Sequence, residues 1–380
     1  MCSVGDDYQD EVENYMEKLD IVKVEKTCNK CKEQESNVLL RGKDGYCKSC
    51  FLIGTEHKFK AFLGKHRFIR KDDWVLVNYE VGHSITSLLH FLRSGIDVKT
   101  PKQLKFKPII LYIERNYHLS IEERRNLLET INRQVKEFNF DIYFVSFLNE
   151  DDLDQINKIC NDKVTPTIRT ELYKQFERRL LVDCAKALGC RHVFACDLAV
   201  DVASQILTNV SLGRGSYLQM DIGICDSRDD NVNIIKPLRF FDIKELVFYN
   251  YFNELIPVVI RKEEADPYSS VQNLMVNFVQ NLQTNFPSTI TTVVKTGDKL
   301  SMDKEIFNNR KCELCSLPIE DRNSGLTSAE ATDFSHWLST YRPELETRSP
   351  ERYNEALVRF ERDDSKYCFS CSKIAEFLIK

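Results

Sequence analysis

The sequence predicts an α/β fold, a doubly wound parallel sheet flanked by an N-terminal and a C-terminal zinc-binding module. Two observations lead to this prediction. Short apolar runs of strand length alternate with longer helical stretches through the middle of the chain, as in a parallel sheet. In addition, eight of the 14 cysteines form four Cys-x-x-Cys pairs, a spacing typical of zinc sites.

Composition places the chain among globular proteins. It has 380 residues, of which 42% are hydrophobic and 29% charged, and this length suits roughly two or three domains. No apolar run reaches the roughly 18 residues that a membrane span needs. Residues 1–20 are acidic and lack the apolar segment of a signal peptide, so we expect no such peptide here. We expect these residues to be a loose tail. Without a secretion signal, paired cysteines favour metal over disulfides, so we expect a reducing, cytoplasmic location.

The predicted N-terminal zinc module spans residues 21–57. Its ligands are the pairs Cys28/Cys31 and Cys47/Cys50, separated by 15 residues, which is the spacing of a treble-clef or ribbon site. Four thiolates leave no open coordination position, so the predicted role of this zinc is structural.

A basic run follows at residues 58–71, with six Lys or Arg, three Phe and no acidic residue. Basic residues interleaved with aromatic ones favour contact with RNA phosphates and a splayed base. The alternative is an amphipathic helix whose Phe side packs in the core and whose Lys side is solvated. The two interpretations are compatible, because Phe can pack inward while Lys contacts phosphate. The overall net charge of −5 still allows such a local patch. The candidate RNA-binding residues are Lys58, Lys60, Lys65, Arg67, Arg70 and Lys71.

A second basic run precedes the second predicted strand. Its members are Lys99, Lys102, Lys105 and Lys107. We expect a solvated loop here, with RNA contact as the alternative.

The α/β domain is predicted over residues 58–260. Its expected strands are at about 75–78, 108–113, 142–147, 192–196 and 232–238. Its expected helices are at about 84–94, 121–138, 168–188, 198–212 and 243–255. Gly189 and Gly213 follow two of these helices and are predicted C-caps. In such a sheet the ligand crevice lies at the carboxyl ends of the strands.

A helical extension is predicted over residues 261–311, with one helix at about 269–282. The C-terminal zinc module (312–380) carries Cys312/Cys315 and Cys368/Cys371, which bracket 52 residues. We interpret this as a zinc site with a charged insertion at about 320–364. Two alternatives remain open, that one pair binds no metal and that the site does not close within one chain.

Residues 74–90 indicate a strand, a tight loop at Gly82 and a helix, and the start of such a helix commonly faces a phosphate. This stretch resembles the PP-loop of ATP pyrophosphatases, which reads Ser-Gly-Gly-x-Asp-Ser. The matching residues here read Glu80-Val81-Gly82-His83-Ser84-Ile85. One Gly survives, Ser84 replaces the Asp, and Glu80 brings a carboxylate to the place where a phosphate would enter.

The order of zinc module, PP-loop domain and zinc module resembles the tRNA 2-thiolation enzymes, which adenylate a tRNA uridine with ATP and then attach sulfur. Asp201 matches one acidic position of a second family motif. The family's three active-site cysteines would fall near Thr170, Tyr173 and Asp266, and none of these is a cysteine. The resemblance therefore implies a scaffold that is retained without the reaction, an adenine-nucleotide-hydrolase-like domain with at most a degenerate nucleotide site at Gly82, Ser84 and Asp201.

The resemblance also implies partners. The chain would pair as a heterodimer with an intact catalytic paralogue and bind tRNA, while sulfur would come from a thiocarboxylated ubiquitin-related modifier. Zinc would occupy both modules, and the altered loop weighs against ATP binding. Two alternatives are an active adenylating enzyme with a rewired loop and a zinc-based adaptor without RNA contact.

Several other residues invite a catalytic interpretation. We expect Cys184 and Cys196 to be buried structural thiols, His83 to be a surface histidine, and Asp201 to act at the start of a helix.

Overall fold

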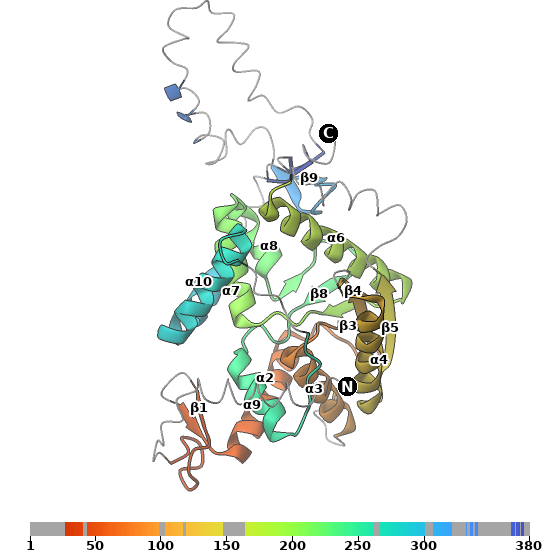
Figure 1. Ribbon diagram of the computed structural model, residues 1–380, viewed down its shortest axis with the longest axis vertical. Helices are drawn as coiled ribbons and strands as arrows, with labels where there is room; N and C mark the ends of the chain where they lie inside the picture. Colours follow the sequence, from red (N-terminus) through yellow and green to blue (C-terminus); the bar gives the residue numbers. More distant parts are fainter. Residues whose placement is uncertain are drawn as a thin grey trace, which may run out of the picture.

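A six-stranded sheet lies at the centre of the molecule (Figure 1). In spatial order its strands are β5 (Asp141–Ser146), β4 (Lys107–Glu114), β3 (Trp74–Asn78), β6 (His192–Phe194), β8 (Asn233–Ile235) and β7 (Cys225–Asp226). Neighbouring strands are parallel, except that β7 runs antiparallel to β8. The predicted α/β class with a mostly parallel sheet is therefore confirmed.

This computed structural model describes most of the chain. The described residues are 27–40, 44–98, 103–116, 119–146, 164–260, 266–300 and 307–320, with short pieces at 332, 335–336, 339–340, 366–368, 370–372 and 374–375. The predicted tail at 1–20 and most of the predicted insertion at 320–364 lie outside these residues.

Helices cover both faces of the sheet. Successive residues of β3 alternate between two cores, because side chains of a strand point to opposite faces. Val75 and Val77 pack with α3 (His83–Asp97), α4 (Ile121–Glu137) and α9 (Ile243–Phe252). Leu76 packs on the other face, against α6 (Pro166–Ala187). α2 (Lys48–His66) lies against α3 and α9.

A third helical group lies beside the sheet and contains the predicted extension. It consists of α7 (Ala199–Ser211), α8 (Leu218–Ile222), α10 (Val271–Asn285) and α11 (Pro287–Gly297). A 3-10 turn, η1 (Gly215–Tyr217), leads into α8. None of the described helices combines the length and apolar character that a membrane span requires.

The Cys-rich segments lie at opposite ends of the molecule (Figure 1). The N-terminal one contains the hairpin β1 (Val38–Leu40) and β2 (Asp44–Tyr46) and leads directly into α2. The C-terminal one contains β9 (Phe307–Lys311) and β10 (Pro318–Glu320) next to α6.

Most predicted elements are present within a few residues of their expected bounds. Gly189 and Gly213 have φ values of +68° and +72°, as expected for C-caps. Two predictions differ from the structure. The basic run at 58–71 is helical only to His66 and continues as a loop, and the fifth strand is shorter than predicted because a turn begins at Pro237. The sequence also missed β7 and α11.

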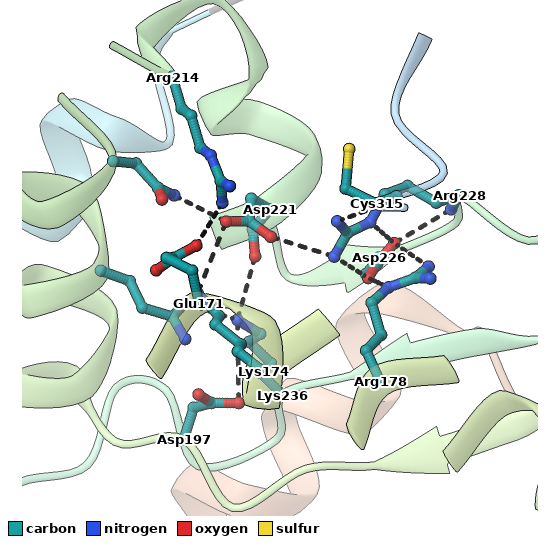
Figure 2. Close-up of polar contacts among 12 residues, drawn as sticks. Glu171, Lys174, Arg178, Asp197, Arg214, Asp221, Asp226, Arg228, Lys236 and Cys315 are labelled. Atoms are coloured by element: carbon teal, nitrogen blue, oxygen red, sulfur yellow. Dashed lines mark hydrogen bonds and ion pairs between the residues drawn. The ribbon is translucent and has the colours of Figure 1, made fainter. Parts of the chain in front are cut away.

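A buried ion-pair network joins the sheet edge, α6 and the C-terminal segment (Figure 2). Asp226 of β7 accepts hydrogen bonds from Arg178 Nε at 2.8 Å and from Arg228 Nη2 at 2.6 Å. Arg228 Nη1 also donates to the carbonyl of Cys315 at 3.3 Å. Burial alone would raise the pKa of Asp226, but the two guanidinium groups lower it to about 2. The network therefore holds the second Cys-rich segment on the α/β domain.

The substitution Asp226→Asn tests this network. It removes the negative charge that Arg178 and Arg228 share, which leaves two buried guanidinium groups without this ionic partner. We therefore expect the free energy of unfolding near neutral pH to fall by about 3 kcal/mol. The pKa of Asp226 lies below its ordinary value of 3.8, so its stabilisation is present above 3.8 and is lost as the pH falls through about 2. Urea unfolding of both proteins at a series of pH values measures this difference.

The control for this test is Asp230→Asn, because Asp230 is 86% exposed and pairs with Lys311 at the surface. We expect a change within about 0.5 kcal/mol for it. A difference between wild type and Asp226→Asn that stays constant into strong acid would contradict the assignment.

Candidate functional site

The crevice expected of a nucleotide-binding sheet lies where β3 and β6 end. The two strands are parallel neighbours, with Val77 opposite Phe194. The next strand after β3 along the chain, β4, lies on one flank of this pair, and the strands after β6, β7 and β8, lie on the other. Such a switch point is where open α/β sheets bind ligands. Glu80 follows β3 and Asp197 follows β6, so two carboxylates meet at this edge.

The loop between β3 and α3 keeps the shape that its glycine predicts. Gly82 is the N-cap of α3 with φ +136° and ψ −171°, a backbone conformation that side chains rarely allow. Its carbonyl accepts a hydrogen bond from Thr86 Oγ1 at 3.1 Å. Ser84 lies in the first turn of the same helix. Gly82 and Ser84 thus occupy the positions that a phosphate-binding loop would use.

His83 begins α3 and is half-buried, so the prediction of a surface histidine is wrong. Asn250 of α9 donates from Nδ2 to the His83 carbonyl at 3.1 Å and lies 3.3 Å from ring Nδ1. Burial lowers the pKa of His83 to about 4. The imidazole is therefore neutral near pH 7 and cannot provide a positive charge for a phosphate.

Carboxylates crowd the place where a nucleotide would enter. Glu80 is exposed, yet desolvation by the surrounding protein raises its pKa to about 7. Arg115 opposes this rise, and the negative charges of Glu177, Asp197 and Asp201 add to it. Glu80 Oε1 also accepts a hydrogen bond from Asn78 at 3.0 Å.

Glu177 is one of these carboxylates. Burial raises its pKa, although Arg115 Nη1 donates to it at 2.7 Å. Arg115 therefore partners one carboxylate of this edge, and Lys236 Nζ lies 3.8 Å from another, Asp197.

Asp201 has the role at a helix start that the sequence predicted. Its Oδ2 accepts a hydrogen bond from the backbone N–H of Leu198 at 2.8 Å, which caps α7.

Among the described residues, only cysteines bring three or more metal-ligating atoms together.

None of the three positions that match the family's active cysteines is a thiol, and α6, which carries two of them, contacts the start of α10. Near Thr170 and Tyr173 on α6, Thr167 Oγ1 accepts from the backbone of Val271, a few residues beyond Asp266. The four described cysteines outside the clusters are Cys184, Cys190, Cys196 and Cys225. Burial raises the pKa of each, so all four are protonated thiols and poor nucleophiles near pH 7.

The four N-terminal cysteines converge on one point. The Sγ atoms of Cys28, Cys31, Cys47 and Cys50 all lie within 4.8 Å of one another, and those of Cys31 and Cys47 are 3.9 Å apart. A tetrahedral zinc with Zn–S bonds of about 2.3 Å separates its sulfurs by roughly 3.8 Å, so these residues fit a zinc ion.

The four C-terminal cysteines converge in the same way within this one chain. The Sγ atoms of Cys312, Cys315, Cys368 and Cys371 lie within 4.8 Å of one another, with Cys315 and Cys368 at 3.7 Å. Each cluster contains the same tight turn. The residue directly after its second cysteine has a positive φ, +59° at Lys32 and +59° at Ser316. The backbone N–H groups of these two residues donate to the carbonyl oxygens of Cys28 and Cys312, respectively.

The predicted RNA-binding residues divide into two groups. Lys58 is structural, because its Nζ lies 2.6 Å from Glu245 Oε2 and over the Phe241 ring. Lys60 pairs with Glu56 at 3.5 Å. The others are exposed at the end of α2 or in the following loop: Lys65, Arg67, Arg70 and Lys71. Of these, Lys71 lies 3.9 Å from Asp72 and the other three have no carboxylate of the described chain within ion-pair distance.

The sheet order and the flanking Cys clusters define an α/β protein with a mostly parallel sheet and a four-cysteine cluster near each end. The U34-tRNA thiolase NcsA from Methanococcus maripaludis, solved with its 4Fe-4S cluster, superimposes with a TM-score of 0.58 at 18% identity, over 76% of this chain and 95% of that one. The family model described as Cytoplasmic tRNA 2-thiolation protein 2 matches residues 270–373.

Relatives of that description align over nearly the whole chain. The Anopheles gambiae protein is 30% identical, over 90% of this chain and 87% of its own length. The Xenopus laevis protein 2-B is 28% identical, over 89% of this chain and 81% of its own length. The chain belongs to the cytoplasmic tRNA 2-thiolation protein 2 family.

Metal analysis tests the two clusters. We expect two zinc ions per chain, and we expect Cys31→Ser and Cys315→Ser each to retain about one, because a site with three thiolates binds zinc much more weakly. Cys184→Ser is the control and should retain both ions, since Cys184 lies outside the clusters. Unchanged metal content in either cluster variant, or iron in place of zinc, would contradict the assignment.

Proposed function

We propose that this chain is the non-catalytic subunit of a heterodimeric, cytoplasmic tRNA 2-thiolation complex. It binds tRNA and a catalytic paralogue, and the complex adds sulfur to the wobble uridine of Lys, Glu and Gln tRNAs. The sulfur comes from a thiocarboxylated ubiquitin-related modifier, and zinc occupies both Cys clusters. Membership in the family supports a role in tRNA 2-thiolation. The proposal that the partner, and not this chain, is catalytic rests on the residues around Glu80.

The observation that carries the proposal is the acidic crevice. A nucleoside triphosphate is strongly anionic, and carboxylates at the place where its phosphates would enter repel it. Here Glu80 stands at the entry, with Asp197 and Asp201 close enough to raise its pKa. The neutral His83 supplies no compensating charge. Adenylation therefore falls to the partner.

Basic side chains support a role in tRNA binding. Lys65, Arg67 and Arg70 are exposed and have no carboxylate partner in the described chain, so their charges remain available. They precede β3, which places them at the amino edge of the sheet, opposite the acidic crevice. A phosphate backbone would bind such a cluster through its charges.

Charge reversal tests tRNA binding by this subunit. The double variant Lys65→Glu/Arg67→Glu should weaken tRNA binding about tenfold and make it less dependent on salt, because fewer counterions are released. Filter binding or fluorescence anisotropy at several salt concentrations measures both quantities.

Lys299→Glu is the matched control, because Lys299 is exposed beyond the end of α11 and far along the chain from this cluster. It should bind as wild type does. If the double variant also kept its affinity and salt dependence, the alternative of a zinc-based adaptor without RNA contact would be preferred.

A further inference from the structure

We propose that a hollow beside α2 binds an unpaired nucleotide of RNA, with the base in its apolar interior and the neighbouring phosphates on its basic rim. This inference rests on the proposed RNA-binding function and specifies the form of RNA that is bound. The hollow lies between the second half of α2, the loop before β3 and the loop before β4.

The hollow is large enough for a nucleotide. Its volume is about 660 Å³, within the range of about 300–1,000 Å³ that is usual for small-molecule sites. Its apolar lining comes from two segments of the chain: Leu63, Phe68, Ile69, Leu104 and Phe106. A base that left its helix would find a dry surface here in place of its lost stacking partners.

One aromatic side chain of the lining is held in a fixed orientation. The ring of Phe68 stacks on His66 with centroids 5.6 Å apart and an interplanar angle of 6°. His66 in turn contacts Phe62, which is buried in the core. A held aromatic ring suits base stacking, which tolerates any base sequence.

The rim of the hollow carries one sign of charge. Its cationic members are Lys60, Arg67, Arg70, Lys71 and Lys105, and no Asp or Glu lines the hollow. Arg67, Arg70 and Lys105 have no carboxylate of the described chain within ion-pair distance. The two basic runs, far apart in sequence, meet because the N–H of Asp72 donates to the Lys105 carbonyl at 2.6 Å.

This arrangement favours single-stranded RNA over other anions. The cations come from two segments of the chain, so they match several phosphates along a strand better than one compact anion. The apolar interior matches a base, and a base inside a duplex cannot enter it because it is stacked and paired. Unpaired loop nucleotides are the form of RNA whose bases are free to do so.

Gly64 provides a test that leaves every charge in place. It lines the hollow, and a Cβ atom built on it would meet no atom within 4 Å. Gly64→Trp should therefore fill the hollow while α2 remains folded, because tryptophan is a better helix former than glycine. We expect this variant to bind tRNA, and a short unstructured oligoribonucleotide, about tenfold more weakly.

The matched control is Gly54→Trp, ten positions earlier on the same helix, where a Cβ would also meet nothing within 4 Å. Gly54 does not line the hollow, so this variant should bind both RNAs as wild type does. The salt dependence of Gly64→Trp should also equal that of wild type. Circular dichroism confirms folding, and Gly64→Leu provides a second filling side chain of different shape.

Each outcome decides the inference. Weaker binding by both Gly64 variants with normal binding by Gly54→Trp supports it. Wild-type binding by folded Gly64 variants overturns it, and the proposed function stands if Lys65→Glu/Arg67→Glu still binds poorly. The inference is also overturned if an acidic peptide, but not the oligoribonucleotide, displaces bound tRNA from the wild-type chain, since the hollow would then be a protein-docking site. If wild type binds no RNA, the proposed function fails first.

Discussion

The parallel pairing of β3 with β6 fixes which side chains meet at the carboxyl edge of the sheet. Because both strands end there, the residues that follow them must share one crevice, whatever their charge. In a nucleotide-binding relative this edge would hold phosphate. Here it brings Glu80 toward Asp197 and Asp201, and the pKa of Glu80 rises to about 7. Carboxylates at this edge oppose a phosphate, which is the physical basis of the non-catalytic role that we propose.

The two Cys clusters act on different parts of this scaffold. The first lies at the start of α2, where Cys47 is the N-cap, and the hollow that contains Gly64 lies near its other end. The helix has 19 residues, so it extends for about 28 Å. Arg214 joins the second cluster to α6, because its Nη1 lies 2.5 Å from Glu171 (Figure 2) and its Nη2 lies 4.0 Å from Cys371 Sγ. Each cluster therefore lies against one end of the α/β domain.

Local patterns predicted the elements that depend on local chemistry, namely the buried strands, the glycine caps and the spaced cysteines. The sequence missed α11 because its Thr and Val residues are weak helix formers, and burial of Ile290 and Val294 against α7 outweighs that preference. It missed β7 because a two-residue strand shows no alternation. Lys58 could not be assigned from the sequence, since its partner Glu245 lies 187 residues away on α9. The hollow likewise joins segments that are separate in sequence.

Thiolation of unmodified tRNA by purified chain, with ATP and a thiocarboxylated sulfur donor, tests the central claim most directly. The assay is run with this chain alone, with the catalytic paralogue alone and with both together. Our account predicts no thiolated product from this chain alone and full activity only from the pair. Product from this chain alone would contradict the account, because it would require ATP to bind at the acidic crevice and a nucleophile among thiols such as Cys196 or Cys225 whose pKa burial has raised.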